Sequence, residues 1–273
     1  MKNAQKIVGL IPAGGRASRL NPLPFSKELF PVGFHATDKG LRPKVVSHYL
    51  LEKMRHAKIT TAYIILREGK WDIPSYFGDG KLLDMHLAYL MMDLPFGVPF
   101  TLDQAYPFIK DSMVALGFPD MIFHPDDAFG ELRLRLEESE AEVVLGLFPA
   151  HNPSKTDMVE LDERGRVRRI HIKPHCTELL YAWEIAVWTP VFTEFLHEYV
   201  LSLREKYKKR RTDSGEQEEL HVGNVFQAAI KNRMRVDSVL FQDGSCLDIG
   251  TPEDLISAIH RATLDKANRS VKI

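Results

Sequence analysis

The sequence predicts an α/β protein with a doubly wound, mixed but mostly parallel sheet. Apolar runs of strand length alternate along the chain with segments of helical spacing, which is the pattern of consecutive βαβ units. Several of these runs are apolar throughout, as expected of strands buried on both faces. A chain of 273 residues with 44% hydrophobic content is long enough for one large core. We therefore expect a single domain over residues 1–273, with a small second lobe.

The first part of the chain alternates regularly between the two kinds of element. The strands expected there are Lys6–Ala13, Thr61–Leu66, His86–Met92 and Asp120–Phe123. The helices expected there are Pro43–Ala57, Thr101–Ile109 and Leu132–Glu140. A polar loop is expected over residues 16–34, directly after the first strand.

The second part adds a predicted hairpin to this alternation. Its arms are Asp157–Asp162 and Arg166–Lys173, joined by a turn at Glu163–Gly165. Further strands are expected at Glu142–Phe148, Tyr181–Trp188 and Val236–Phe241, and helices at Val191–Leu203, Val225–Asn232 and from Pro252 to about Lys266. Residues 204–219 contain 11 charged side chains among 16, so a mobile loop is expected there.

Composition excludes several classes of protein. The formal net charge is −1, and the basic run 206–211 is followed by acids, so no nucleic-acid partner is expected. The two cysteines, Cys176 and Cys246, have no spacing typical of a zinc site or a disulfide framework. No run approaches the roughly 18 apolar residues of a membrane span, so we expect no membrane partner and a cytoplasmic location.

The loop after the first strand carries the strongest chemical signal. Gly14 and Gly15 allow backbone N–H groups to approach a phosphate chain closely, and Arg19 and Lys27 supply positive charge. Neither a Walker A loop nor the dinucleotide-binding GxGxxG pattern is present. In doubly wound sheets ligands bind beyond the carboxyl ends of the strands, where this loop is expected.

The segment IPAGGRASRLNPLPFSKELFPVG resembles the opening signature LAGGxGTRLxPLTxxxxKxLLPV of the sugar-1-phosphate nucleotidyltransferases, in particular glucose-1-phosphate thymidylyltransferases and their uridylyl relatives. The resemblance spans residue 7 to about residue 260. It implies that Arg19 and Lys27 are catalytic and that Ala13, Gly14 and Gly15 bind nucleotide. One departure is Ala17, which stands where the family has the second glycine of GxG.

Two further segments of the resemblance imply a Mg²⁺ site. Phe123–Asp127 is similar to the family's GDN segment, so Asp126 is expected to bind the metal and the nucleotide. Cys246–Pro252 is similar to the WxDxGTP segment, so Asp248 is expected to be the second ligand. The alternative for Asp126 is a turn or a helix N-cap. Thr251 and Pro252 are expected to begin the last helix.

The acceptor pocket implied by the resemblance departs from the family. Lys173 matches the lysine of the EKP segment, which contacts the sugar phosphate, but Ile172 replaces its glutamate. Asp157 and Glu184 stand where the family has glycines. These two carboxylates are expected either to bind the acceptor, through hydroxyls or a cationic group, or to face solvent. Gly97 falls near the family's base-reading glycine.

The function implied is the transfer of a nucleotide from a triphosphate, dTTP or UTP, to a sugar 1-phosphate with release of pyrophosphate. Residues 1 to about 130 are expected to bind the nucleotide and residues 131–273 the acceptor. A homo-oligomer is also expected, since members of the family often form one. Two alternatives stay open: a non-catalytic nucleotide-binding protein on the same fold, and an enzyme with an acceptor other than glucose 1-phosphate.

Overall fold

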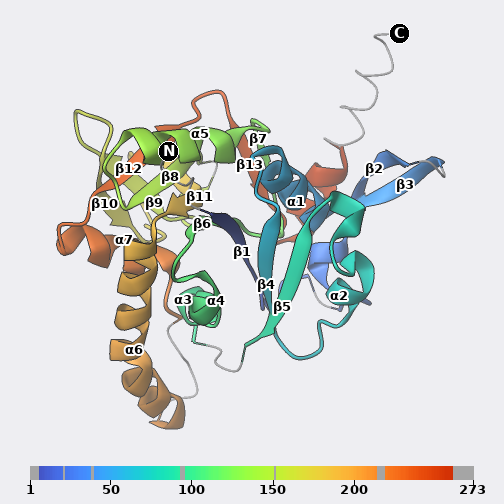
Figure 1. Ribbon diagram of the computed structural model, residues 1–273, viewed down its shortest axis with the longest axis horizontal. Helices are drawn as coiled ribbons and strands as arrows, with labels where there is room; N and C mark the ends of the chain where they lie inside the picture. Colours follow the sequence, from blue (N-terminus) through green and yellow to red (C-terminus); the bar gives the residue numbers. More distant parts are fainter. Residues whose placement is uncertain are drawn as a thin grey trace.

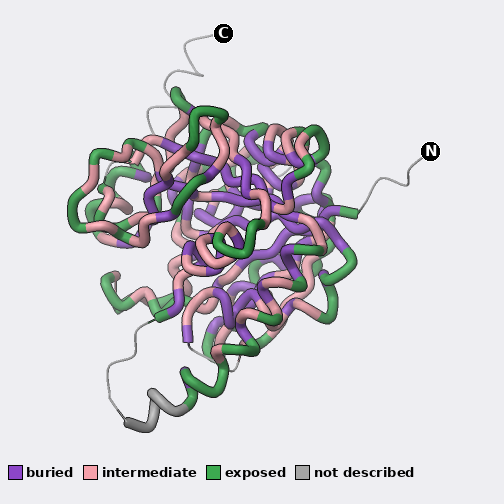
Figure 2. The backbone as a smooth tube through the Cα atoms, turned by 90° about the vertical axis from the view of Figure 1, so that its left-hand side faces the viewer, coloured by how far each residue is buried: buried purple, intermediate pink, exposed green. Residues whose placement is uncertain are grey.

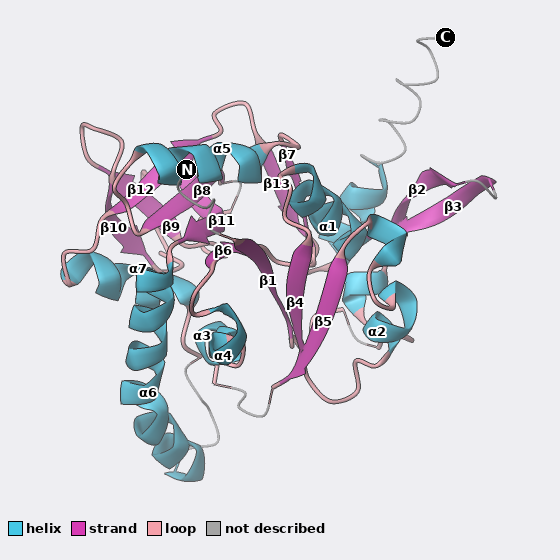
Figure 3. Ribbon diagram, viewed as in Figure 1, coloured by secondary structure: helices cyan, strands magenta, loops and turns pink. Residues whose placement is uncertain are grey.

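One large sheet runs through the protein (Figures 1 and 3). The computed structural model describes residues 6–20, 22–37, 40–92, 96–150, 152–213 and 219–260, with side chains 209–213 left out. Within these residues the sheet has nine strands, in the order β10-β9-β11-β6-β1-β4-β5, and β8 joins β12 to β11. The strands are β1 (Ile7–Ala13), β4 (Thr61–Leu66), β5 (His86–Met91), β6 (Met113–Leu116), β8 (Val143–Pro149), β9 (Met158–Leu161), β10 (Val167–His171), β11 (Tyr181–Trp188) and β12 (Val236–Leu240).

Strand direction decides which residues meet at one edge. The strands β6, β1, β4 and β5 are parallel, so their carboxyl ends share an edge. By contrast, β11 is antiparallel to β6, with Ala186 opposite Leu116. The first half of β11 therefore extends past the carboxyl end of β6, at the same edge. The predicted mixed, mostly parallel α/β fold is confirmed.

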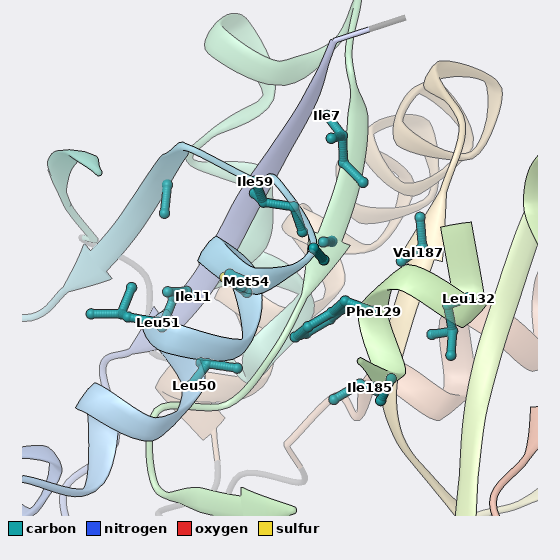
Figure 4. Close-up of a cluster of buried hydrophobic side chains, with 14 of the residues drawn as sticks. Ile7, Ile11, Leu50, Leu51, Met54, Ile59, Phe129, Leu132, Ile185 and Val187 are labelled. Atoms are coloured by element: carbon teal, nitrogen blue, oxygen red, sulfur yellow. The ribbon is translucent and has the colours of Figure 1, made fainter. Parts of the chain in front are cut away.

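Helices α1 (Val46–His56) and α5 (Ala128–Glu138) cover one face of the sheet. Figure 4 shows Leu50 and Met54 of α1 and Phe129 of α5 gathered over the sheet strands. Met54 lies against Gly9 of β1, where an added Cβ would come within 2.8 Å of its sulfur. The apolar stripe predicted for α1 is thus the stripe that packs on the sheet.

Helices α3 (Val98–Asp103), α4 (Tyr106–Ile109), α6 (Pro190–Asp213) and α7 (Val222–Lys231) cover the opposite face. Aromatic rings contact one another within this second core. The ring of Phe226 contacts both Trp183 and Phe192, with centroids 5.0 and 5.3 Å apart. The tube in Figure 2 is purple along the central strands, where both faces are covered.

The predicted strands agree closely with the structure at most positions. Thr61–Leu66 and Tyr181–Trp188 match β4 and β11 residue for residue, and the predicted hairpin is the antiparallel pair β9–β10. The expected helix at Thr101–Ile109 is instead the two short helices α3 and α4. Strand β6 was not predicted, because its four residues are too few to show a period.

The expected mobile loop over residues 204–219 is wrong for its first part. Helix α6 continues to Asp213, so residues 204–213 are helical, and residues 214–218 lie outside the described chain. A run of charged side chains is typical of a mobile loop, but it is also tolerated on the exposed face of a helix. At the end of the chain, residues 252–260 are helical and the rest of the predicted last helix lies outside the described residues.

Two small antiparallel ribbons accompany the main sheet. The first pairs β2 (Pro31–Thr37) with β3 (Gly40–Val45) and projects from the body of the protein (Figure 1). The second pairs β7 (Met121–His124) with β13 (Ser245–Asp248), with Met121 opposite Asp248. In the described part of the chain, no helix is long and apolar enough to cross a membrane.

His48 makes the stability of the fold depend on pH. It is buried on α1 between the rings of His35 and Phe77, and burial lowers its pKa to about 4 from 6.5. In the unfolded chain His48 is therefore protonated below about pH 6.5, whereas in the folded chain it stays neutral down to about pH 4. Stability is lost as the pH falls through this interval, by about 2 kcal/mol at pH 5.

We predict that His48→Leu reduces the difference in unfolding free energy between pH 7.5 and pH 5 by about 2 kcal/mol. Urea unfolding at both pH values measures this difference. An unchanged difference in the variant would mean that other groups cause the acid sensitivity.

Candidate active site

Three segments that follow parallel strands gather at the carboxyl edge of the sheet. Residues 14–27 follow β1, residues 67–72 follow β4, and residues 117–120 follow β6. The β7–β13 ribbon then brings the end of β13 to the same place, because Asp248 pairs with Met121. Four distant parts of the sequence therefore meet at this edge, as expected for a doubly wound sheet.

Lys27 and Asp120 form an ion pair at the centre of this edge. Lys27 begins η1, a single 3₁₀ turn over Lys27–Leu29. The two side chains are only 14% and 17% exposed. Burial tends to lower the pKa of Lys27, but the negative charges of Asp120, Asp248 and Glu28 outweigh it, so this pKa is raised. Lys27 is therefore a fixed positive charge.

Asp248 and Arg19 complete this central group. Both approach Gly250: an added Cβ there would lie 2.8 Å from Arg19 Nη2 and 3.2 Å from Asp248 Oδ2. Surrounding protein, and then the negative charge of Asp120, raise the pKa of Asp248 to about 6, although Lys27 and Arg19 oppose this. Much of the Asp248 side chain is nevertheless open to solvent. Two carboxylates and two cations thus share one small region.

The expected pairing of Asp126 with Asp248 is corrected by the structure. Asp126 lies past the far end of the β7–β13 ribbon, since His124 pairs with Ser245 while Met121 pairs with Asp248. The ribbon alone separates the two ends by about 10 Å at the rise of a strand. Asp126 is exposed and forms an ion pair with Lys53 of α1. Asp120 is the acid that lies beside Asp248.

The sequence did not reveal Asp120 because strand β6 was missed. Its run Met113–Leu116 is short and fully buried, and three residues separate it from the acid. The sequence instead predicts a strand at Asp120–Phe123, and Pro125–Asp127 follows it in the way a ligand segment follows a strand. The signal that would have found Asp120 is the unbroken apolar run Met113–Phe118 just before it.

The glycine loop has room for a ligand at some positions and not at others. Ala13 is buried in the core, so only its backbone faces the loop. Gly14 lies against the sulfur of Met92, which leaves no space for a Cβ, whereas Gly15 is exposed with open space around it. Ala17 has φ +51°, in the left-handed region that favours glycine.

Gly97 is required by the packing of the backbone. Its φ is +113°, and an added Cβ would collide with the main chain of Leu220. The two residues form an isolated parallel bridge at the start of α3. The expected contact of Gly97 with a nucleobase stays a prediction, beside this established packing role.

Asp157 is internal and does not face solvent, and its expected contact with an acceptor stays a prediction. It is 8% exposed, and its carboxylate lies over Gly223 at the N-terminus of α7. Burial raises its pKa, while His221, Lys173 and Trp183 oppose the rise. Lys173 has φ +38°, and its side chain is exposed.

Glu184 of β11 lies near the acids Asp120 and Asp248. The register between β11 and β8 shifts between Trp183 and Ile185, so Glu184 sits at a bulge. Surrounding protein raises its pKa to about 8, with further contributions from Asp248, Asp157 and Asp120. The side chain keeps some exposed surface. At neutral pH it is therefore mostly a protonated, partly accessible carboxyl group beside the central acids.

Comparison with known proteins shows the family. The model of the nucleotidyl transferase family matches residues 8–264, almost the whole chain. The protein therefore belongs to the nucleotidyl transferase family.

Individual relatives are distant. A glucose-1-phosphate thymidylyltransferase of Streptomyces antibioticus is 24% identical over 260 residues, and the alignment covers 94% of this chain and 66% of the relative. The chain thus spans just under two thirds of that relative's length.

Among solved structures, a UDP-glucose pyrophosphorylase complexed with UDP-glucose superposes with a TM-score of 0.74 at 17% identity, covering 96% of this chain and 100% of the other. The inositol-1-phosphate CTP transferase of T. maritima gives 0.68 at 18% identity, covering 95% and 98%. These two structures share the fold.

Ala17 offers a test of the loop conformation. We predict that Ala17→Val lowers the free energy of unfolding by about 1–2 kcal/mol relative to Ala17→Gly, because a β-branched side chain is strained at positive φ. Denaturant unfolding of the two variants measures this. Equal stabilities would show that residue 17 leaves the left-handed region in solution.

Proposed function

We propose that the protein transfers a nucleoside monophosphate from a nucleoside triphosphate to a sugar 1-phosphate and releases pyrophosphate. The observation that carries this proposal is the meeting of Arg19, Lys27, Asp120 and Asp248 at the carboxyl edge of the sheet. Family membership and the names of the relatives support it.

The proposed transfer of the nucleoside monophosphate needs positioning of the substrates and stabilisation of charge, and it needs no general base. A phosphate oxygen of the acceptor is already anionic at neutral pH, and it attacks the α-phosphorus of the triphosphate while pyrophosphate leaves. Lys27 and Arg19 are the two cations placed to neutralise the growing charge on the α-phosphate and on pyrophosphate. Because Lys27 stays protonated beside Asp120, its charge is present throughout.

Asp120 and Asp248 fit a Mg²⁺ ion. They are neighbouring hard oxygen donors. Burial, and then the negative charge of Asp120, raise the pKa of Asp248, and a bound cation would offset that negative charge. Among the described residues, no group of three or more His, Cys, Asp or Glu is placed to hold a metal. A site with two carboxylates is typical of Mg²⁺ shared with substrate phosphates. When bound there, Mg²⁺ would polarise and neutralise the phosphates of the nucleotide.

In this proposal, the nucleotide is bound by residues before about residue 130, and the acceptor is bound by residues after it. The part before it contributes the backbone of Gly14 and Gly15 and, in this proposal, Gly97 for the base of dTTP or UTP. The part after it contributes Lys173 for the acceptor phosphate and Glu184 for a hydroxyl of the acceptor. A protonated Glu184 can donate a hydrogen bond as well as accept one.

The direct test is pyrophosphate release from a panel of nucleotides and acceptors in the presence of Mg²⁺. The nucleotides are dTTP, UTP, CTP, ATP and GTP, and the acceptors are glucose 1-phosphate, an amino-sugar 1-phosphate, inositol 1-phosphate and phosphocholine. We expect release that depends on both a nucleotide and an acceptor, and a loss of about 100-fold in Lys27→Ala.

Two outcomes would count against the proposal. Nucleotide binding without release for any acceptor would favour the non-catalytic alternative. Activity that survives Lys27→Ala undiminished would reject the role of that side chain.

A matched pair of substitutions tests whether Asp120 or Asp126 acts together with Asp248 in the reaction. We predict that Asp120→Asn lowers kcat about 100-fold or more, while Asp126→Asn changes it less than about threefold. The reason is that Asp120 lies beside Asp248 and Lys27, whereas Asp126 pairs with Lys53 at the other end of the ribbon. Steady-state rates over a Mg²⁺ titration measure both variants. A larger loss in Asp126→Asn would contradict this assignment.

A further inference from the structure

The segment that carries Lys27 is anchored at the residues on both sides of it. Lys27 stands on one 3₁₀ turn, which by itself has few backbone hydrogen bonds. Its neighbours Ser26 and Glu28 are both bound by residues that follow β4, on the other side of β1 from β6. The Lys27 side chain meanwhile reaches Asp120, which follows β6.

Asp72 holds Ser26 with two hydrogen bonds. The Ser26 backbone N–H donates to Asp72 Oδ2 at 2.6 Å, and the Ser26 hydroxyl donates to Asp72 Oδ1 at 2.7 Å. Asp72 itself begins α2 (Asp72–Phe77) and accepts from the N–H of Ile73 at 3.1 Å. Bonds to an ionised acceptor from two donors of one residue fix its position as well as its orientation.

Lys70 holds Glu28 through a buried ion pair. The Lys70 and Glu28 side chains are 5% and 2% exposed. Burial raises the pKa of Glu28 against the influence of Lys70, and burial lowers the pKa of Lys70. Glu28 Oε2 has no hydrogen-bond partner. Such a pair is weak grounds for a gain in stability, since apolar residues of similar volume often serve as well.

A third contact completes the anchoring. The hydroxyl of Ser47, on α1, donates to the carbonyl oxygen of Glu28 at 2.7 Å. We call Ser26, Glu28, Ser47, Lys70 and Asp72 the Lys27 clamp.

We propose that the Lys27 clamp is a positioning device, in which Lys70 and Asp72 hold Lys27 against Asp120 in the geometry that the triphosphate requires. The inference rests on the proposed function. Its physical basis is that a lysine side chain has four flexible bonds, so only a fixed backbone and a fixed partner keep its charge in one place. A small displacement of a group that stabilises charge is enough to lower the rate substantially.

The first test measures the position of Lys27 without turnover. Lysine amines of the wild type and of the variants Asp72→Ala and Lys70→Met are labelled with a dilute acylating reagent, and the rate at each lysine is followed by mass spectrometry. We expect Lys27 to label about tenfold faster in both variants, because its pairing with Asp120 is loosened. Lys44 and Lys53, which are paired elsewhere, should keep their wild-type rates.

The matched control is Asp237→Ala. Asp237 is also buried and ion-paired, with Arg135 at 2.9 Å, but it lies on β12 away from the carboxyl-edge site. This substitution should lower the melting temperature about as much as Asp72→Ala without changing the labelling of Lys27. Asp72→Asn, which retains one acceptor oxygen, should restore part of the protection.

The second test uses pyrophosphate release with the substrates that the panel identifies. Asp72→Ala and Lys70→Met should lower kcat about tenfold or more per folded molecule and leave KM for the acceptor nearly unchanged. The double variant Glu28→Leu/Lys70→Met should regain the melting temperature but not kcat. Asp237→Ala should keep the wild-type kcat.

The outcomes separate this inference from the function on which it rests. Wild-type labelling of Lys27 in both clamp variants would overturn the clamp, whatever the activity. Faster labelling with an unchanged kcat would overturn its role in the reaction. A wild type that is inactive on the whole panel would reject the proposed function, while the labelling rates would still decide whether the clamp holds Lys27.

Discussion

The ion pair between Lys27 and Asp120 is the interaction on which the site depends. It joins the segment after β1 to the segment after β6, and these two strands are hydrogen-bonded neighbours in the centre of the sheet. Asp248 enters the same group through the β7–β13 ribbon. Without the cations Lys27 and Arg19, two carboxylates at this edge would repel each other. The site is therefore a balance between two positive and two negative side chains.

The fold provides this balance by packing rather than by local sequence. Both faces of the sheet are covered by helices with separate apolar cores, so the central strands are held rigidly. The loops after their carboxyl ends carry the polar groups of the site. Residues after β4 play a part that is easily overlooked, since Lys70 and Asp72 hold the turn on which Lys27 stands.

Much of the fold was visible in the sequence because its strands are long and apolar. Thr61–Leu66 and Tyr181–Trp188 were identified residue for residue, and the N-cap at Thr251 was also correct: its hydroxyl accepts from the N–H of Asp254 at 3.3 Å. The errors have physical causes. Strand β6 is too short for periodicity, and the charged end of α6 has the composition of a loop.

By itself the sequence determined the α/β class, the cationic loop of Arg19 and Lys27, and Asp248, because each depends on local composition or on a motif of adjacent residues. Only the tertiary structure decided which second acid joins them. Asp120 and Asp126 are six residues apart and chemically alike, and each follows a short apolar run, so the local sequence makes both of them candidates. The antiparallel register of β7 with β13 distinguishes them, since it places Met121, and not His124, opposite Asp248. Register is a property of two strands more than a hundred residues apart, so no single segment of the sequence contains it.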